Sequence, residues 1–501
     1  MIKSRFIVSA LMVFLACSAY TQPLDGTPIE LTEFLPMLSD AGFEPINQEF
    51  PLLLGQDPDN DDREAQTCVL ADGTVVVFWV NRGGSHHISG MKPDGSRFYP
   101  VLGANESDII VGANTGSNTN WTLCERSFDG TKFVVGATWQ YGQLEGTDAS
   151  LPPTVGDGEM DGNRTDEGQG HGFFKIFDSN FNEVTSGPVS VGQFSLGHRE
   201  WGAGGLSDGK WVIGVMSRDH RWEIDPDAEF ASRTPFVNIF NPDGTRFKDE
   251  FAPIVEEGQG QLTEDLTGSQ GGRFHIAPMS DCFAFIIRRG TGNEPKIIIY
   301  DNDGNVINSY STVDNEVFEG LEVGEWIAGA GADFFVALFT TTGTQAMADL
   351  GMPEDLIDSS VLLARKFDKN GPLGPYILVS TSSDIDVGGV NRPRIAMAPN
   401  GSFALSWEDQ FSDSLDYTKS MAFRVFNADG TPASPAALAH DLPELDPDGF
   451  GDPGEPMIGM YNNFISLTWG SRAFGTGNRD VVVNVVANPA QDSDVRGWEL
   501  Y

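Results

Sequence analysis

Cysteine and positive charge are both scarce in this sequence. Four of its 501 residues are cysteine, and 31 lysines and arginines stand against 72 aspartates and glutamates, which gives a formal net charge of −41. So few cysteines exclude a disulfide-rich scaffold, and burial of apolar side chains must therefore stabilise the fold. The negative charge repels nucleic acid and anionic membrane surfaces, so neither is an expected partner.

Long apolar runs are absent beyond the first residues, and no later stretch can cross a bilayer as a helix. The start, MIKSRFIVSALMVFLACSAYTQ, has a basic beginning, an apolar run from Phe6 to Cys17 and small residues that end at Ala19. That order is typical of a secretory signal peptide, so we expect residues 1–22 to be removed and the protein to be secreted, periplasmic or on the cell surface. A buried N-terminal helix and a lipid anchor at Cys17 are the alternatives, although the residues before Cys17 depart from the usual lipobox.

A unit of two hairpins repeats seven times, with copies roughly sixty residues apart. The first hairpin joins a strand of small residues to an apolar strand, as in CVLADGTVVVFW, TLCERSFDGTKFVVGATW, WGAGGLSDGKWVIGVM, FHIAPMSDCFAFIIRR, WIAGAGADFFVALFT, RIAMAPNGSFALSW and MIGMYNNFISLTW. The second contains a polar turn, as in ISGMKPDGSRFYPVL, FFKIFDSNFNEVTSG, FVNIFNPDGTRFKDEF, KIIIYDNDGNVINSY, LLARKFDKNGPLGPYI, AFRVFNADGTPASPA and VVVNVVANPAQ.

These units predict an all-β fold, a seven-bladed β-propeller of four-stranded blades. Asp-Gly and Asn-Gly between alternating runs are strong hairpin signals, and no helical period lies between the units. The Gly and Ala of the first strands suit strands that converge on an axis. Trp79, Trp407 and Trp469 recur after the first turn and are expected to be core residues.

The segment QEFPLLLGQ, from Gln48 to Gln56, is similar to the outer strand SRFYPVLGAN and is expected to complete the last blade, with the tail RGWELY as a competitor. We therefore divide the chain into residues 1–22 (signal peptide), 23–46 (N-terminal arm, with a short helix expected in LTEFLPMLSDAG) and 47–501 (propeller). From Asp57 to Tyr501 the repeat pattern resembles the seven-bladed propellers of secreted bacterial proteins. That resemblance implies a fold and no activity.

Six of the seven residues that lie eight positions before the first turn of each unit, where the chain enters the central channel, are charged: the set is Glu64, Trp121, Glu200, Arg273, Glu325, Arg392 and Glu455. One interpretation is a set of ion pairs between neighbouring blades. The other is a ring at one channel mouth that binds a ligand.

Glu455 and Glu64 adjoin across the closure without an intervening arginine, beside Asp57, Asp59 and Asp61 of the loop DPDNDD. Clustered carboxylate oxygens favour Ca²⁺, so these five residues are candidate calcium ligands. The EF-hand pattern itself fails, and a solvated acidic loop is the alternative.

Histidine, arginine and aromatic residues gather in the links on the ring side of blades 2 and 3. Candidate catalytic residues are Tyr141, His198, Arg199 and His220, and candidate binding residues are Trp201, Arg218 and Trp222 together with the ring members Trp121, Glu200, Arg273, Glu325 and Arg392. His86 and His87 also fall in a predicted link. Such a mixture suits a glycan, since aromatic faces stack on sugars, arginine binds carboxylate or sulfate and histidine moves protons. Solvated side chains with local pairs are the alternative.

Several sharper motifs fail or are absent. GGLSDGKW begins like a P-loop but has Trp211 where Ser or Thr is required, and no HExxH, GxSxG or sialidase-type Asp box occurs. The sequence therefore favours a secreted propeller that binds a glycan, an acidic polysaccharide above all, on the channel-mouth face. An enzyme, either a polysaccharide lyase or a glycoside hydrolase, and a cell-surface scaffold for other proteins are the alternatives.

Overall fold

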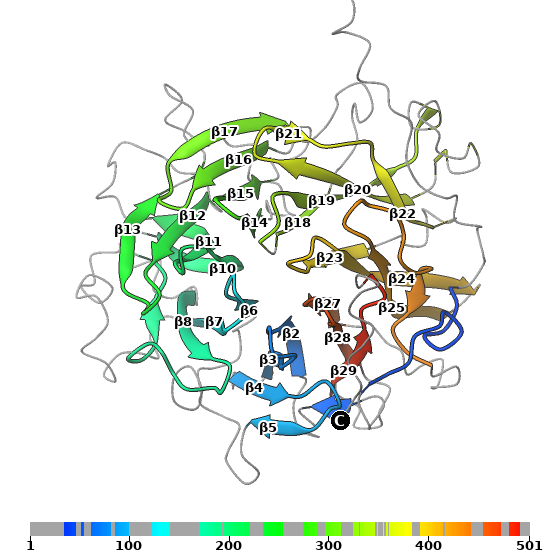
Figure 1. The fold of residues 1–501 in the computed structure, drawn as a ribbon, viewed down its shortest axis with the longest axis horizontal. Helices are drawn as coiled ribbons and strands as arrows, with labels where there is room; N and C mark the ends of the chain where they lie inside the picture. The colour runs from blue at the N-terminus through cyan, green and yellow to red at the C-terminus, as the bar shows by residue number, and fades with distance from the viewer. Residues whose placement is uncertain are drawn as a thin grey trace, which may run out of the picture.

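The computed structural model describes most of the repeat units and part of the arm. The described residues are 35–46, 52–54, 62–81, 86–99, 122–140, 170–192, 195–220, 234–251, 253, 274–287, 296–311, 324–329, 331–345, 348, 354, 357–358, 360–382, 391–413, 416–441, 454–471 and 480–490. Within them the chain forms seven antiparallel sheets arranged as the blades of a ring, a seven-bladed β-propeller (Figure 1). Among these residues no helix has the length and hydropathy needed to cross a membrane.

Each blade has four strand positions in order from the axis to the rim, and in blade 5 the outer position is shared by two short strands that both pair with the third strand (Figure 1). The inner strands are β2 (Asp62–Val69), β6 (Thr122–Arg126), β10 (Ser195–Gly205), β14 (Phe274–Pro278), β18 (Gly324–Ala328), β23 (Asn391–Met397) and β27 (Gly454–Met460). The second strands are β3 (Val75–Asn81), β7 (Lys132–Gln140), β11 (Trp211–His220), β15 (Cys282–Ile287), β19 (Phe335–Thr342), β24 (Phe403–Asp413) and β28 (Phe464–Ser471).

The third strands are β4 (His86–Met91), β8 (Gly170–Asp178), β12 (Thr234–Phe240), β16 (Lys296–Asp301), β20 (Ser360–Asp368), β25 (Asp416–Phe426) and β29 (Asp480–Ala487). The outer strands are β5 (Arg97–Tyr99), β9 (Val189–Ser190), β13 (Arg246–Phe251), β17 (Val306–Ser311), β21 (Gly371–Pro372) with β22 (Ile377–Ser382), β26 (Ala437–Leu438) and β1 (Leu52–Leu54). Strands of this length match the alternating runs between turn signals in the sequence.

The ring is closed by strand β1, which pairs with β29 and brings Leu52 opposite Val483. The prediction that an N-terminal strand completes the last blade is therefore confirmed. The described part of the arm continues this attachment, since the amide of Ile46 donates to the carbonyl of Val485 at 2.8 Å. Leu38 and Phe43 are buried in the core between blades 6 and 7. Residues 38–42, where a short helix was expected, form a turn instead.

Neighbouring inner strands pack so closely that side chains must be small where they meet. A Cβ atom on Gly205 of blade 3 would lie 2.5 Å from the Cα of Ser127 in blade 2. A Cβ on Gly329 of blade 5 would lie 2.4 Å from the carbonyl oxygen of Pro278 in blade 4. The small residues of the inner strands are thus required by the approach of one backbone to another.

Away from the axis the blades diverge and large side chains fill the space between them. Trp79, Trp407 and Trp469 are 0%, 0% and 4% exposed, which confirms that they are core residues. Each belongs to an apolar cluster that joins its own blade to a neighbour.

Aspartate organises the hairpin turns. In the repeated Asp-Gly-Thr or Asp-Gly-Ser sequence, one carboxylate oxygen accepts hydrogen bonds from both the amide and the hydroxyl of the residue two positions later, as in Asp94 to Ser96, Asp129 to Thr131, Asp243 to Thr245 and Asp429 to Thr431. The glycine between them has positive φ, for example 86° at Gly244. These bonds stabilise the ionised carboxylate and lower the pKa of Asp94 and of Asp243.

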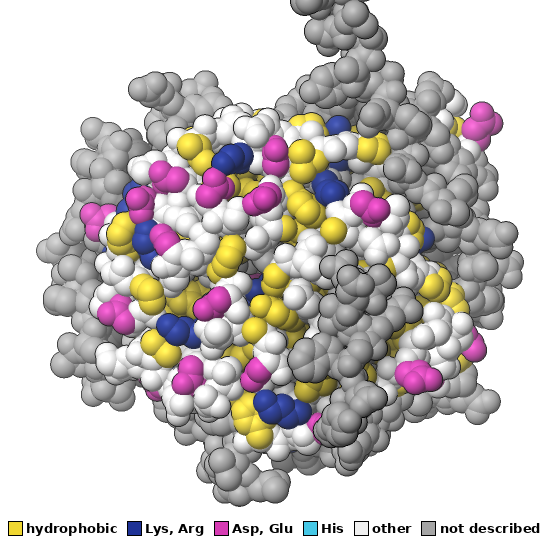
Figure 2. All heavy atoms as spheres, in the orientation of Figure 1, with side chains coloured by type: hydrophobic (Ala, Val, Ile, Leu, Met, Phe, Trp, Pro, Cys, Tyr) yellow, Lys and Arg dark blue, Asp and Glu magenta, His cyan; other side chains and the backbone are white. Residues whose placement is uncertain are grey.

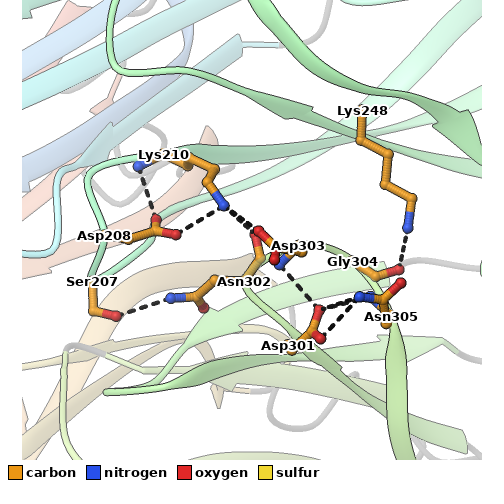
Figure 3. A network of polar contacts seen from close by, with 9 residues as sticks. All are labelled: Ser207, Asp208, Lys210, Lys248, Asp301, Asn302, Asp303, Gly304 and Asn305. Atoms are coloured by element: carbon orange, nitrogen blue, oxygen red, sulfur yellow. Dashed lines mark hydrogen bonds and ion pairs between the residues drawn. The ribbon is translucent and has the colours of Figure 1, made fainter.

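Turns of adjacent blades are also joined by lysines. Lys210 in blade 3 binds Asp208 of its own turn at 2.9 Å and Asp303 of blade 4 at 2.5 Å (Figure 3). In the same network Lys248 donates to the carbonyl of Gly304 at 2.5 Å. Figure 2 shows one face of the ring, on which basic side chains lie among acidic ones instead of gathering in a patch. Lys210 and Lys248 thus join the turns of blades 3 and 4.

The crowding at the axis can be tested with Gly205→Ala. We expect a loss of about 2 kcal/mol in the free energy of unfolding, since the new Cβ meets the backbone of blade 2 and not a flexible side chain. Gly374→Ala is the matched control because no atom lies within 4 Å of the position that its Cβ would occupy. Urea unfolding followed by tryptophan fluorescence measures both, and equal stabilities would contradict the packing argument.

Candidate functional site

Four predicted ring positions lie at irregularities in the inner strands. In β2 the pairing shifts between Arg63 and Gln66, so that Glu64 and its neighbour face a single residue of β3. Similar shifts include Glu200 in β10, Arg392 in β23 and Glu455 in β27. β-bulges re-aim side chains and are enriched beside functional sites.

The bulges share a second feature in three blades. The residue of the second strand that lies across from the bulge is Trp79 in blade 1, Trp407 in blade 6 and Trp469 in blade 7. Each core tryptophan therefore marks the level of the channel at which a ring residue occurs.

The other ring positions differ. Glu325 lies in β18 and pairs regularly with Phe339 of β19. Trp121 and Arg273 directly precede β6 and β14 and lie outside the described residues. Whether the seven positions form ion pairs or a ligand-binding ring stays a prediction.

Blade 3 carries a two-stranded ribbon at its ring side. Strand β11 pairs with β12 as far as Ser217, whereas Asp219 and His220 at its end pair only with β10 among the described strands, and Arg218 lies between these two stretches. This ribbon brings His198 opposite Ser217, and His220 opposite Ser195. Four predicted site residues, at positions 198, 199, 218 and 220, are therefore gathered on one short element at the ring side of the blade.

The ladder register divides this group. Positions directly opposite one another share a face of a ribbon, and successive positions alternate. Position 199 pairs with 216, which places it on the same face as positions 218 and 220, whereas position 198 belongs to the other face. Positions 199, 218 and 220 therefore share one face of the ribbon, and position 198 lies on the other face.

The remaining predicted residues lie in different parts of the chain. Trp201 is partly buried, and its ring lies 3.1 Å from the position of a Cβ on Gly136, so it packs between blades 2 and 3. Tyr141, Trp222, Asp57, Asp59 and Asp61 lie outside the described residues. Glu64 and Glu455 belong to neighbouring inner strands. No group of three or more metal-ligating residues occurs in the described part of the chain, and calcium binding stays a prediction.

His86 and His87 do not lie in a link. Both belong to β4, where the buried His86 ring stacks on Phe78 and the His87 ring stacks on Trp79 with centroids 5.3 Å apart. Burial lowers the pKa of His86 to about 3, so this histidine is a neutral core residue. The expectation that they belong to a link is wrong because the third strand of blade 1 begins at His86.

A second ribbon lies on blade 6 and was not expected from the sequence. Strands β24 and β25 continue together to the pair Asp413 and Asp416, beyond the last pairing of inner strand β23 at Glu408. The sequence signal is the length of the polar stretch after Trp407, which here continues the hairpin. The described strands thus form a ribbon at the ring side of two blades, β10 with β11 in blade 3 and β24 with β25 in blade 6.

The channel contains a charged pair that sequence reasoning also missed. A cavity of about 80 Å³ is lined by residues of six blades, and blade 2 contributes Glu125 and Arg126 at the end of β6. In the other blades the position of Glu125 holds Cys68, Gly204, Ala277, Gly329, Ala396 or Gly459. The position of Arg126 holds Val69, Gly205, Pro278, Ala330, Met397 or Met460. Alignment of the seven inner strands would have revealed this exception.

Arg126 crosses the axis. Its guanidinium donates to the carbonyl oxygen of Met397 in blade 6 at 3.2 Å and to that of Ser127 at 3.1 Å. It also lies over the ring of Tyr461 in blade 7, 4.9 Å from the centroid. Blade 2 is adjacent to neither of these blades, so the contacts require Arg126 to span the channel near the hairpin turns.

The first turn of blade 2 completes this closure. The amide of Ala71 in blade 1 donates to the carbonyl of Gly130 at 3.0 Å, and a Cβ on Gly331 in blade 5 would lie 2.9 Å from the Phe128 ring. Together with Arg126, this turn therefore touches blades on every side of the axis and closes the channel at the turn side.

Glu125 is the other member of the pair. One carboxylate oxygen accepts a hydrogen bond from the amide of Arg126 at 3.0 Å. Burial raises the pKa of Glu125 in spite of the neighbouring guanidinium. A carboxyl with raised pKa at the bottom of a channel is a candidate functional group, although a buried ion pair that holds blades together shifts pKa values in the same way.

Comparison with known proteins leaves the activity open. No family model and no curated protein matches the chain. Similar solved structures include a protein of unknown function from Dyadobacter fermentans (12% identity, 89% of this chain and 99% of that chain, TM-score 0.41) and NanB sialidase from Streptococcus pneumoniae (11%, 87% and 70%, 0.39). Another is SapL1 lectin in complex with alpha methyl fucoside (10%, 75% and 95%, 0.36). At these similarities the fold assignment rests on the strand topology of the chain itself.

Removal of the guanidinium tests whether Arg126 joins the blades. We expect Arg126→Met to lower the free energy of unfolding by about 3 kcal/mol, since buried carbonyl acceptors lose their donor and Glu125 loses its counter-charge. The double variant Glu125→Gln/Arg126→Met should lose less than the sum of the single losses. Urea unfolding of the original protein, of the single variants Arg126→Met and Glu125→Gln and of the double variant measures the coupling energy. Strictly additive losses would contradict an interaction between the two side chains.

Buried histidines predict instability in acid. Burial lowers the pKa of His86 to about 3 and that of His440 to about 4, so the unfolded chain binds more protons than the folded one below pH 6.5. Stability is then complete above pH 6.5 and falls as the pH decreases toward 4, by up to about 1.4 kcal/mol per pH unit for each histidine.

The test compares the slope of unfolding free energy against pH between 4.5 and 6.5. His86→Gln should reduce this slope by up to about 1.4 kcal/mol per pH unit, which corresponds to the uptake of one proton. Asp243→Asn should leave it unchanged, because hydrogen bonds from Thr245 lower the pKa of that aspartate and it titrates below this window. An unaltered slope in His86→Gln would show that the pKa of His86 is the same in the folded and unfolded states and would contradict its burial as a neutral ring.

Proposed function

We propose that the protein binds a glycan on the ring side of the propeller, across the channel mouth beside the blade 3 ribbon. The observation that carries this proposal is the gathering of positions 199, 218 and 220 on one face of the ribbon, next to the bulge at Glu200. Two arginines and a histidine at neighbouring positions are unusual in a chain with a net charge of −41. Anionic groups are the ligands that such a cluster recognises.

The ligand class follows from the chemistry of that cluster. Arginine binds carboxylate and sulfate through parallel N–H donors, and histidine adds a further donor to a sugar hydroxyl. The field of the remaining chain repels anions at long range, so binding must depend on short contacts and on desolvation at the ribbon. An acidic polysaccharide, which presents one anionic group per repeat, fits these requirements.

The channel supports binding across the mouth and not through the ring. Arg126 and the turn of blade 2 close the axis at the turn side. The cavity of about 80 Å³ above Arg126 is far smaller than pockets that enclose drug-sized ligands, which occupy several hundred Å³. A polymer therefore approaches from the ring side alone and lies between the ribbons of blades 3 and 6.

The register favours binding over catalysis. A lyase needs a group that neutralises the substrate carboxylate, a base and an acid around one sugar. Position 198 belongs to the ribbon face opposite positions 218 and 220, and this register disfavours a shared acid–base role for the two histidines. A lyase in which Tyr141 supplies the second group remains the alternative within the same substrate class.

Affinity measurements test the proposal. Isothermal titration with a panel of uronate-containing, sulfated and neutral polysaccharides should reveal an anionic ligand, and Arg218→Ala and His220→Ala should each weaken its binding about tenfold or more. Lys369→Ala is the control, because this exposed lysine pairs with Asp281 at the hairpin turns. Ultraviolet absorbance and product length in the same mixtures detect cleavage. Absence of binding across the panel would contradict the proposal and favour a protein-binding scaffold.

A further inference from the structure

Two buried cysteines on adjacent blades lie side by side. Cys68 of inner strand β2 and Cys124 of inner strand β6 are 3% and 5% exposed. The Cys124 thiol donates a hydrogen bond to the sulfur of Cys68, with the two sulfur atoms 3.5 Å apart. The two strands are direct neighbours in the ring, so their separation is fixed by the fold.

We propose that Cys68 and Cys124 are an oxidisable pair that forms a disulfide between blades 1 and 2 on exposure to a peroxide or an equivalent oxidant. A disulfide requires a sulfur separation of about 2.05 Å, which the two thiols reach by a change of side-chain rotation of modest size. Both side chains belong to the same apolar cluster between blades 1 and 2, with no third residue between the sulfurs. Export from the cytoplasm, which the sequence predicts, would supply the oxidising surroundings.

The two cysteines have different access to an oxidant. Cys68 lines the channel cavity together with Glu125 and Arg126, and Cys124 is not among the lining residues. Burial and the neighbouring Cys68 raise the pKa of the Cys124 thiol, which suppresses its thiolate. Because it lines the cavity, Cys68 is the sulfur that a small oxidant meets first, and Cys124 resolves the product.

The chemistry balances with hydrogen peroxide as oxidant. The Cys68 thiol loses its proton to water, and its sulfur attacks one peroxide oxygen, so that an S–O bond forms, the O–O bond breaks and hydroxide leaves to become water. The Cys124 sulfur then attacks the sulfur of this sulfenic acid. The S–S bond forms, the S–O bond breaks, and the leaving hydroxide takes the proton of the Cys124 thiol and departs as a second water. Two thiols and one peroxide thus give one disulfide and two waters.

A disulfide between Cys68 and Cys124 would stabilise the folded ring. The two cysteines are 56 positions apart in sequence, so the disulfide closes a loop that contains the outer part of blade 1. Closure of a loop restricts the unfolded chain and stabilises the folded one. It also joins the strand that carries Arg126 to blade 1, which fixes the residue that closes the channel. The proposed disulfide does not depend on glycan binding.

Peptide mapping tests the pair directly. The purified chain, before and after treatment with hydrogen peroxide, is alkylated under denaturing conditions and digested with trypsin. After peroxide treatment we expect peptides 64–82 and 98–126 to be joined by the disulfide, with a mass two hydrogens below the sum of the two peptides. Reduction should separate them. Reduction of the oxidised protein should lower Tm by a few degrees.

Cys282 provides the matched control. It is a buried cysteine of β15 whose thiol pKa burial raises to about 12, and it has no cysteine neighbour among the described residues. Cys282→Ala should keep both the joined peptide and the effect of reduction on Tm, whereas Cys68→Ala should lose both. Recovery of peptides 64–82 and 98–126 as separate alkylated species, from peroxide-treated protein and from protein refolded in air, would overturn the proposal.

Discussion

Seven strands must meet at one axis, and the space that this leaves determines much of the molecule. Where β10 approaches the turn of blade 2, and β18 approaches β14, no Cβ atom fits at Gly205 or Gly329. Because the side chains of the inner strands are small, a narrow channel remains along the axis. One arginine from one blade is then long enough to cross it and to bond to the opposite side. Toward the rim the blades diverge, and tryptophan and phenylalanine fill the gaps between them.

This geometry separates the two faces of the ring. At the turn side, aspartates cap the hairpins, lysines join neighbouring turns and the turn of blade 2 covers the axis. Polar groups there are largely used by the fold. At the opposite side, bulges interrupt inner strands, and blades 3 and 6 carry two-stranded ribbons, β10 with β11 and β24 with β25. A ligand that needs free donors and an open surface is better served by the ring side, which is where we place the proposed glycan site.

Repetition made the architecture predictable. Asp-Gly turns between alternating strands gave seven units, the β1 segment resembles an outer strand, and Trp79, Trp407 and Trp469 recur at one position, so each of these features follows from comparison of the units. Features that break the repeat were missed. Glu125 and Arg126 replace small or apolar residues in one unit alone, and no local property of a strand shows that its side chain crosses an axis.

Pairing register also lay beyond the sequence. His198 and His220 look like partners because both follow the pattern of a link, yet the ladder of β10 and β11 assigns their positions to different faces. His86 looked like a link residue until strand β4 was found to begin there. The expected helix at residues 31–42 is a turn over its described part, because attachment of the arm to blades 6 and 7 outweighs the helical pattern.

The central claim is that the two faces have different roles, with ligand recognition on the ring side. Hydrogen–deuterium exchange of the protein, with and without the polysaccharide that binds it best, tests this claim most directly. The account predicts that protection on binding concentrates in residues 195–201 and 215–220 of the blade 3 ribbon and in residues 408–421 of the blade 6 ribbon. Protection confined to the hairpin turns around Asp129, Asp208 and Asp303 would contradict it.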